Sequence, residues 1–124
     1  MNAERKTEEL DLALRTKQHA IRVLYLVRAL PNTIEGRAVA SQLIRSGTSI
    51  GANYRAAKRA RSRAEFISKL GIVIEEADET VFWLEIIIEA ELLPAHRVEP
   101  LLQETRELLA IMVASSRTAS VKRA

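Results

Sequence analysis

The residue types that most often do chemistry in helical proteins are sparse and ungrouped in this sequence. His19 and His96 are the only histidines, and neither follows a glutamate by three residues, so the Glu-x-x-His pattern of helical di-metal sites is missing. The absence of cysteine excludes thiolate nucleophiles, disulfides and cysteine-ligated metal sites. We therefore expect no catalytic site, no metal and no cofactor, and both histidines should be ordinary surface residues.

Hydroxyl and glycine residues between positions 41 and 51 form no catalytic or nucleotide-binding motif. The serines and the threonine have no histidine at a spacing that would activate them, and helical hydroxyls usually bond to a carbonyl of the preceding turn. Gly47 and Gly51 are not followed by Lys-Ser or Lys-Thr, so no phosphate-binding loop is predicted. The sequence predicts a protein that is not an enzyme.

Charge is divided unevenly along the chain, although its net value is only +3. Residues 31–64 contain seven basic and one acidic side chain, whereas residues 65–100 contain two basic and nine acidic ones. This pattern indicates either a phosphate-binding face or helices that attract each other within or between subunits. The candidate nucleic-acid-binding residues are Arg45, Arg55, Lys58, Arg59, Arg61 and Arg63. Because no base-reading motif is present, binding should be indifferent to sequence and strongly salt-dependent.

The elements that must position these residues are helices. Few glycines, prolines and aromatics occur in a composition rich in Leu, Ile, Val, Ala, Glu and Arg, which favours an all-α domain. Apolar residues recur at helical spacing over about 8–30, 33–61, 63–92 and 98–116. Short connections between such segments predict an antiparallel up-down-up-down four-helix bundle spanning 1–116. The small, polar and basic residues 117–124 are expected to form a disordered tail.

Residue types at the segment ends support these boundaries. Pro31 and Pro94 should end the first and third helices. Asn32 or Thr33 can cap the second helix, and Ser62-Arg63-Ala64-Glu65 fits the capping box of the third. In the first segment, the apolar stripe is predicted from the 3-4 spacing of Leu10, Leu14, Lys17, Ile21, Leu24 and Arg28. The residues that widen this stripe are Ala13, Ala20, Val23, Val27 and Leu30.

The second segment contains residues that are unusual inside a helix. Gly47 and Gly51 each cost about 1 kcal/mol relative to alanine, so a neighbouring backbone is expected to approach closely over them. A break between residues 45 and 49, giving two short helices, is the alternative. Asn53 falls on the predicted core seam, where a buried amide would fix the register of packing.

The third segment carries more apolar surface than one core face absorbs. Residues 81–88 are apolar nearly all round the helix, so part of this surface is expected to meet another subunit. The candidate oligomer-interface residues are Val81, Phe82, Trp83, Ile86 and Ile87. Charged residues interrupt this stretch and the first ten residues are polar, which predicts a cytoplasmic protein without a membrane segment or signal peptide.

Three stretches resemble a known bacterial family when taken together. They are Ser46-Gly47-Thr48-Ser49-Ile50-Gly51-Ala52-Asn53-Tyr54, Phe66-Ile67-Ser68-Lys69-Leu70 with Ser62 before it, and Glu76-Ala77-Asp78-Glu79-Thr80 followed by Phe82-Trp83-Leu84. Through these stretches the chain is similar, over roughly residues 10–115, to the four-helix-bundle proteins first known from intervening sequences of 23S ribosomal RNA genes, and to the accessory variability protein of diversity-generating retroelements.

The resemblance implies a homo-oligomer, commonly a ring-like pentamer, with nucleic-acid contact. Retroelement relatives bind a reverse transcriptase and RNA through a basic surface, so a protein partner of that kind is implied too. The chain departs from the pattern at Ala56-Ala57, where many members have Glu-Gly, and at Glu75, where many have Lys. These changes favour RNA or DNA contact at the end of the second helix and disfavour it on the third. The alternative function is a structural or protein-interaction module whose basic and acidic helices pair with neighbouring subunits or an unknown protein.

Overall fold

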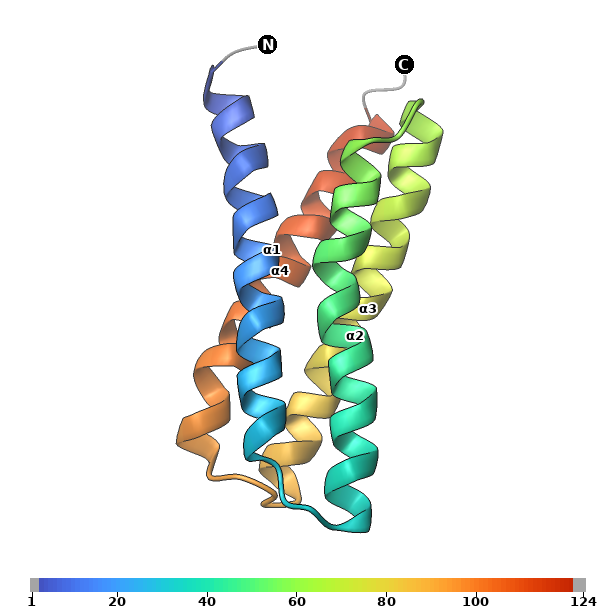
Figure 1. The fold of residues 1–124 in the computed structure, drawn as a ribbon. Coiled ribbons are helices and arrows are strands. Elements are labelled where there is room, and N and C mark those ends of the chain that lie inside the picture. Colours follow the sequence, from blue (N-terminus) through green and yellow to red (C-terminus); the bar gives the residue numbers. More distant parts are fainter. Residues whose placement is uncertain (1–2, 122–124) are drawn as a thin grey trace.

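The protein is a four-helix bundle in a computed structural model that describes residues 3–121, with side chains from residue 12 onward. The helices are α1 (Ala3–Ala29), α2 (Ile34–Lys58), α3 (Arg63–Glu89) and α4 (Ala95–Val121), and the described residues contain no strand. Successive helices run in opposite directions and each packs on the next, with α4 closing back on α1 (Figure 1). The all-α four-helix bundle predicted from the sequence is therefore confirmed.

The starts of α2 and α3 are fixed by capping side chains. Thr33 is the N-cap of α2 and its Oγ1 accepts a hydrogen bond from the Gly36 amide at 3.0 Å. Ser62 caps α3 and its Oγ accepts from the Glu65 amide at 3.0 Å. The Glu65 carboxylate accepts from the Arg61 amide, one residue before the cap. Both caps were predicted from the sequence.

Helix α4 is longer than the sequence predicted. It starts at Ala95 and continues to Val121, so the prediction of a disordered tail is wrong for residues 117–121, and residues 122–124 lie outside the described part. No glycine or proline follows Pro100, and nothing in the sequence therefore stops the helix. Ser120 continues the helical pattern, since its hydroxyl donates to the Ser116 carbonyl at 3.0 Å.

Helices α1 and α2 approach closely along the two glycines of α2. A Cβ at Gly51 would lie 3.2 Å from the Thr16 carbonyl oxygen, and one at Gly47 would lie 2.7 Å from Cγ2 of Val23. The predicted approach of a neighbouring backbone is thus confirmed at Gly51, while a side chain fills the space at Gly47. Because α2 is continuous, the alternative of two short helices is excluded.

The face that α1 turns to the core is opposite to the centre of the predicted stripe, and of the residues predicted to widen the stripe Val23 is fully buried. Thr16, His19, Val23 and Leu26 are buried, whereas Leu14, Ile21 and Leu24 are exposed. The glycines of α2 select the buried face, because they accept Thr16 and Val23 at short range. The 3-4 spacing was present on both faces of α1, and its more apolar side lies outward.

The core has two apolar clusters along the bundle axis. One contains Val23, Leu43, Leu84 and Ile87 near the α1–α2 and α3–α4 connections, and the other contains Ile50, Leu70 and Met112 nearer the chain ends. Helices α1 and α4 share the fewest contacts of the adjacent pairs and diverge toward the end that carries both termini (Figure 1). We call this end, where the two helices are farthest apart, the open end of the bundle.

Asn53 does not have the buried position that the sequence predicted. It is half-buried, and its Nδ2 donates to the Ser49 carbonyl at 2.9 Å within the same helix. The adjacent Tyr54 occupies the core seam instead. A buried polar contact between α2 and α3 is made by Thr80, whose hydroxyl lies 3.0 Å from that of Ser46. This pair, rather than Asn53, can fix the register of the two helices.

Candidate functional site

A pocket with cationic walls lies between α1 and the last turns of α2, at the open end of the bundle. Its volume is about 510 Å³. Its charged lining residues are Lys17 from α1, Arg55 and Lys58 from α2, and Arg59, which is the C-cap of α2. Among the residues whose side chains the structure describes, 12–121, no carboxylate lines it. We call these four residues with the space between them the cationic pocket.

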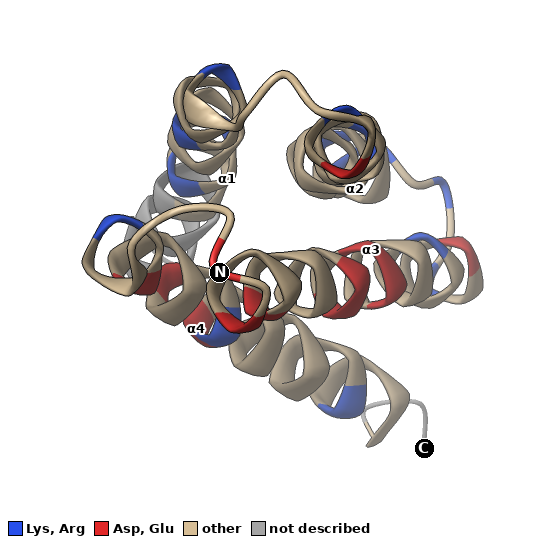
Figure 2. Ribbon diagram, turned by 90° about the horizontal axis from the view of Figure 1, so that it is seen from below, with Lys and Arg blue, Asp and Glu red and all other residues tan. Residues whose placement is uncertain are grey.

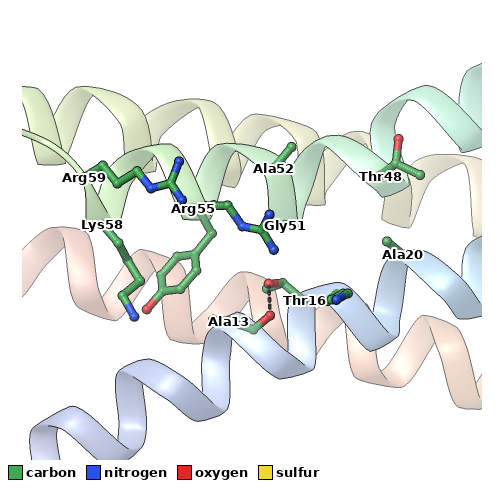
Figure 3. A pocket seen from close by; sticks show the side chains of 11 residues that line it. Ala13, Thr16, Ala20, Thr48, Gly51, Ala52, Arg55, Lys58 and Arg59 are labelled. Carbon is green, nitrogen blue, oxygen red and sulfur yellow. Dashed lines mark hydrogen bonds between the residues drawn. The ribbon is translucent and has the colours of Figure 1, made fainter.

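Small side chains leave the space that the cationic pocket occupies. Ala13 and Ala20 of α1 face Gly51 and Ala52 of α2 across the gap. Arg55 and Lys58 extend from α2 toward α1, and Arg59 lies along α2 beside them (Figure 3). The buried Thr16 hydroxyl donates to the Ala13 carbonyl at 3.2 Å, so its proton is already used within α1. Donors for an incoming anion would thus come from the cationic side chains.

Ion pairs connect the other three helix seams. Arg15 of α1 pairs with Glu104 of α4 at 2.7 Å, and Arg106 of α4 pairs with Glu85 of α3 at 2.9 Å. Arg45 of α2 pairs with Glu76 and Glu79 of α3. At the α1–α2 seam, by contrast, Lys17 and Arg55 place like charges on both sides of a cavity. Among residues 12–121, the cations of this pocket take part in none of these ion pairs.

Arg45 is separate from the cationic pocket. The hydrogen bond between its guanidinium and the Glu79 carboxylate raises the pKa of Arg45 and lowers the pKa of Glu79. Glu79 also accepts from the Trp83 indole Nε1 at 3.3 Å. Arg45 therefore joins the basic segment to the acidic segment within one subunit. Attraction between helices was one of the two interpretations of the charge pattern.

The remaining basic candidates lie at the corner between α2 and α3. Arg61 is exposed in the connection and Arg63 is the exposed first residue of α3. Basic residues mark α1, α2 and this corner, while acidic residues follow α3 (Figure 2). The sequence thus located three of the four charged pocket residues but missed Lys17. The spacing could have indicated this position, because Lys17 lies on the same helix face as the small residues Ala13 and Ala20.

His19 is a core residue and not the surface residue that the sequence predicted. Its side chain is 1% exposed, and Nε2 lies 2.7 Å from Oγ1 of Thr105 on α4. That hydroxyl donates to the Leu101 carbonyl, so it accepts from Nε2–H, and Nδ1 has no hydrogen-bond partner among the described residues. Burial lowers the pKa of His19 to about 4, which keeps the imidazole neutral. His96 is exposed, as predicted.

Most of the predicted oligomer-interface residues pack inside their own subunit. Ile87 is fully buried, so its assignment to an interface is corrected, and Val81, Trp83 and Ile86 pack partly buried against the same cluster. Phe82 alone is largely exposed, at 50%, with its ring 4.9 Å from that of Trp83 in an edge-to-face contact. The core absorbs more of α3 than expected because α1, α2 and α4 all contribute to this cluster.

A larger exposed apolar stripe lies on α1. Leu14, Ile21 and Tyr25 are 53%, 41% and 60% exposed and project opposite to the buried face of the helix. The Arg28 guanidinium stacks over the Tyr25 ring at 5.2 Å. We call these three residues the α1 outer stripe. The sequence pattern predicted Leu14 and Ile21 as core residues and did not include Tyr25.

Within the described residues, no group of histidine and acidic side chains could hold a metal ion. Likewise, none of the described helices combines the length and apolar character needed to span a bilayer.

Comparison with known proteins identifies the class of this bundle. The sequence profile described as 23S rRNA-intervening sequence protein matches residues 8–114, which is most of the chain. The chain therefore belongs to the 23S rRNA-intervening sequence protein family. A solved structure of a protein with unknown function from the S23 ribosomal protein family of Bacteroides thetaiotaomicron is 35% identical, with a TM-score of 0.79 over 85% of this chain and 97% of that one. No curated protein matches the chain.

Proposed function

We propose that this protein is a non-enzymatic, nucleic-acid-associated accessory protein that holds phosphates of RNA or DNA in the cationic pocket. The observation that carries this proposal is the like charge on both sides of the α1–α2 seam. The cavity is surrounded by Lys17, Arg55, Lys58 and Arg59, and no carboxylate of residues 12–121 lines it, whereas the other seams are joined by ion pairs. Repulsion among these cations decreases when an anion binds between them. Arg61 and Arg63 extend the same basic surface toward α3.

A structural role accounts for part of this cluster only. Arg55 and Lys58 lie in the last turn of α2, where cations interact favourably with the helix dipole. Lys17 lies in the middle of α1, far from either end, and gains nothing from a dipole. Its position across the cavity from Arg55 is explained by a shared anionic ligand. We therefore take Lys17 as the most informative residue for testing the proposal.

Binding through this pocket should depend on the phosphate backbone and not on base sequence. A strand that engages all four cations should show log K falling against log salt with a slope of about −3. The family name and the resemblance to retroelement accessory proteins agree with a nucleic-acid context. RNA and DNA should bind similarly, since no recognisable base-reading or 2′-hydroxyl-reading motif is present.

The test is fluorescence anisotropy with a short labelled strand at about 50 mM and about 200 mM salt. The double substitution Lys17→Ala with Arg55→Ala should weaken binding about tenfold or more at the lower salt and reduce the salt slope to about half of its wild-type value. The matched control is Arg37→Ala with Arg97→Ala, which removes the same charge at the other end of the bundle. If both double variants lost the same affinity, the loss would come from the change in net charge and not from the cationic pocket. Absence of binding at low salt would overturn the proposal.

We also propose that the protein assembles with copies of itself. The observation in favour is the α1 outer stripe, an apolar face of a helix that its own bundle leaves uncovered. Phe82 and Ile72 expose apolar surface on α3 in the same way. Exposed apolar faces with polar surroundings are typical of protein-interaction sites. This supports the alternative function of an interaction module, and it is compatible with phosphate binding at the α1–α2 seam.

A further inference from the structure

A second pocket at the open end of the bundle adjoins the cationic pocket. It has a volume of about 680 Å³ and is lined by residues from all four helices, among them Leu12, Phe66, Ile111 and Ala114. Of the described lining residues, Lys58 alone is charged. We call this space the apolar pocket. Its size falls in the range of about 300–1,000 Å³ that is usual for small-molecule sites.

The two pockets share residues and therefore lie side by side. Tyr54 and Lys58 line both of them. A ligand whose phosphate lies at Lys58 can therefore place the portion next to that phosphate either in solvent or in the apolar pocket. Phe66 gives that pocket partly exposed aromatic surface, the buried Tyr54 forms part of its wall, and Ser115 and Thr118 give it hydroxyl groups. An apolar, aromatic cavity with a few hydroxyls next to a cation matches a nucleobase joined to its phosphate.

We propose that the apolar pocket receives one unstacked base of a single strand whose phosphate occupies the cationic pocket. This inference rests on the proposed function. Stacking of a base on aromatic side chains contributes about 1–3 kcal/mol by alanine substitution, which is about five- to hundredfold in affinity. Bases inside a duplex are already stacked and paired, and extracting one costs a few kcal/mol. The protein therefore binds single strands more tightly than duplexes of the same sequence.

Filling the apolar pocket without changing charge tests this assignment. Ala114 and Ala119 line the pocket from α4, and leucine has nearly the helix propensity of alanine, so Ala114→Leu with Ala119→Leu preserves the helix. Ala110→Leu is the matched control, because Ala110 is exposed on the same helix one turn earlier and does not line the pocket. Circular dichroism would verify that the variants keep the helical content of the wild type.

The measurement is anisotropy at low salt with a labelled single strand and with the blunt duplex of the same sequence. The wild type and Ala110→Leu should bind the single strand about tenfold more tightly than the duplex. The filled variant should lose that preference while keeping its affinity for the duplex. With the wild-type protein alone, a strand that carries abasic sites should bind about as weakly as the duplex, which keeps the test valid if the filled variant is unstable.

The outcomes separate this inference from the proposed function. Salt-dependent binding with equal affinity for single strand and duplex, or a filled variant that binds the single strand as the wild type does, would overturn the base pocket and leave the phosphate site intact. A fluorescent fatty acid that the filled variant alone fails to bind, with strand binding unchanged, would assign the pocket to an acyl chain and also overturn it. Absence of binding to any strand at low salt would overturn both proposals.

Discussion

His19 couples the folding of this protein to pH. The folded chain resists protonation of the buried imidazole until pH falls to about 4, whereas the unfolded chain takes up this proton near pH 6.5. The unfolded state thus binds more protons in this interval, and the free energy of unfolding decreases as pH is lowered through it. When the pH has fallen to about 4, the free energy of unfolding has decreased by about 3 kcal/mol because of His19.

We predict that His19→Gln flattens this dependence. A glutamine Nε2 can still donate to Thr105, but it has no proton to gain between pH 6.5 and 4. Urea unfolding at several pH values should show the wild type losing about 3 kcal/mol more than the variant over this interval. His96→Gln is the control, because His96 is exposed and should leave the wild-type slope in place. Identical slopes in the wild type and His19→Gln would contradict burial of His19.

Two glycines of similar helical context should respond in opposite ways to alanine. At Gly47 a new Cβ would lie 2.7 and 2.8 Å from the two methyl groups of the buried Val23, so α1 and α2 must separate. At Gly71 a new Cβ meets no atom within 4 Å. We expect Gly47→Ala to lose about 1–2 kcal/mol of stability and Gly71→Ala to gain about 1 kcal/mol. Thermal and urea denaturation, monitored by circular dichroism, would measure these two changes in stability. Stabilisation at Gly47 would contradict the close helix packing.

The end of α3 shows a helix terminus that carries a strained residue. Glu91 has φ of 57°, and the Leu92 and Glu91 amides donate to the Ile87 and Ile88 carbonyls. These two bonds define a Schellman motif, whose left-handed position normally holds glycine. A residue with a Cβ there costs about 1–2 kcal/mol.

We predict that Glu91→Gly stabilises the protein by about 1 kcal/mol, because glycine adopts the left-handed conformation without steric conflict. Glu91→Ala removes the same carboxylate but keeps the Cβ, so it should give no comparable gain. The difference between the two variants in the midpoint of urea unfolding measures the backbone effect. If alanine stabilised as much as glycine, the gain would come from removing charge in a locally acidic segment.

Helix positions could be predicted from the sequence more securely than helix orientation. The caps at Thr33 and Ser62 are local patterns, and the structure agrees with them. The buried face of α1 is not a local property, because Ile21 and Leu24 are more apolar than Thr16 and His19. It follows from contacts with Gly47, Gly51 and Thr105 on other helices. The same reason explains why Lys17 was placed in an apolar stripe and its role in the cationic pocket was missed.

At the scale of the whole molecule, the outer faces of α1 and α3 are complementary. Within the described residues the backbones of these two helices are not neighbours, because the helices lie diagonally across the bundle. The α1 outer stripe is flanked by Lys17 and Arg28, whereas the exposed Phe82 of α3 lies among acidic residues. If the α1 face of one copy met the α3 face of the next, the contact would be head-to-tail, and such contacts close into rings when the rotation permits.

We predict that Tyr25→Glu with Ile21→Glu lowers the mass of the assembly in solution. Both substitutions place carboxylates on the α1 outer stripe, which would then face the acidic surface of α3 in the next copy. Ile34→Glu is the control, since Ile34 is exposed at the first turn of α2, away from this stripe, where a carboxylate suits the helix dipole. Light scattering after gel filtration at micromolar concentration should give an oligomer for the wild type and the control and a smaller species for the double variant. A wild-type monomer would refute self-assembly through this face. If the double variant kept the wild-type mass, copies would instead meet through the exposed residues of α3 or another surface.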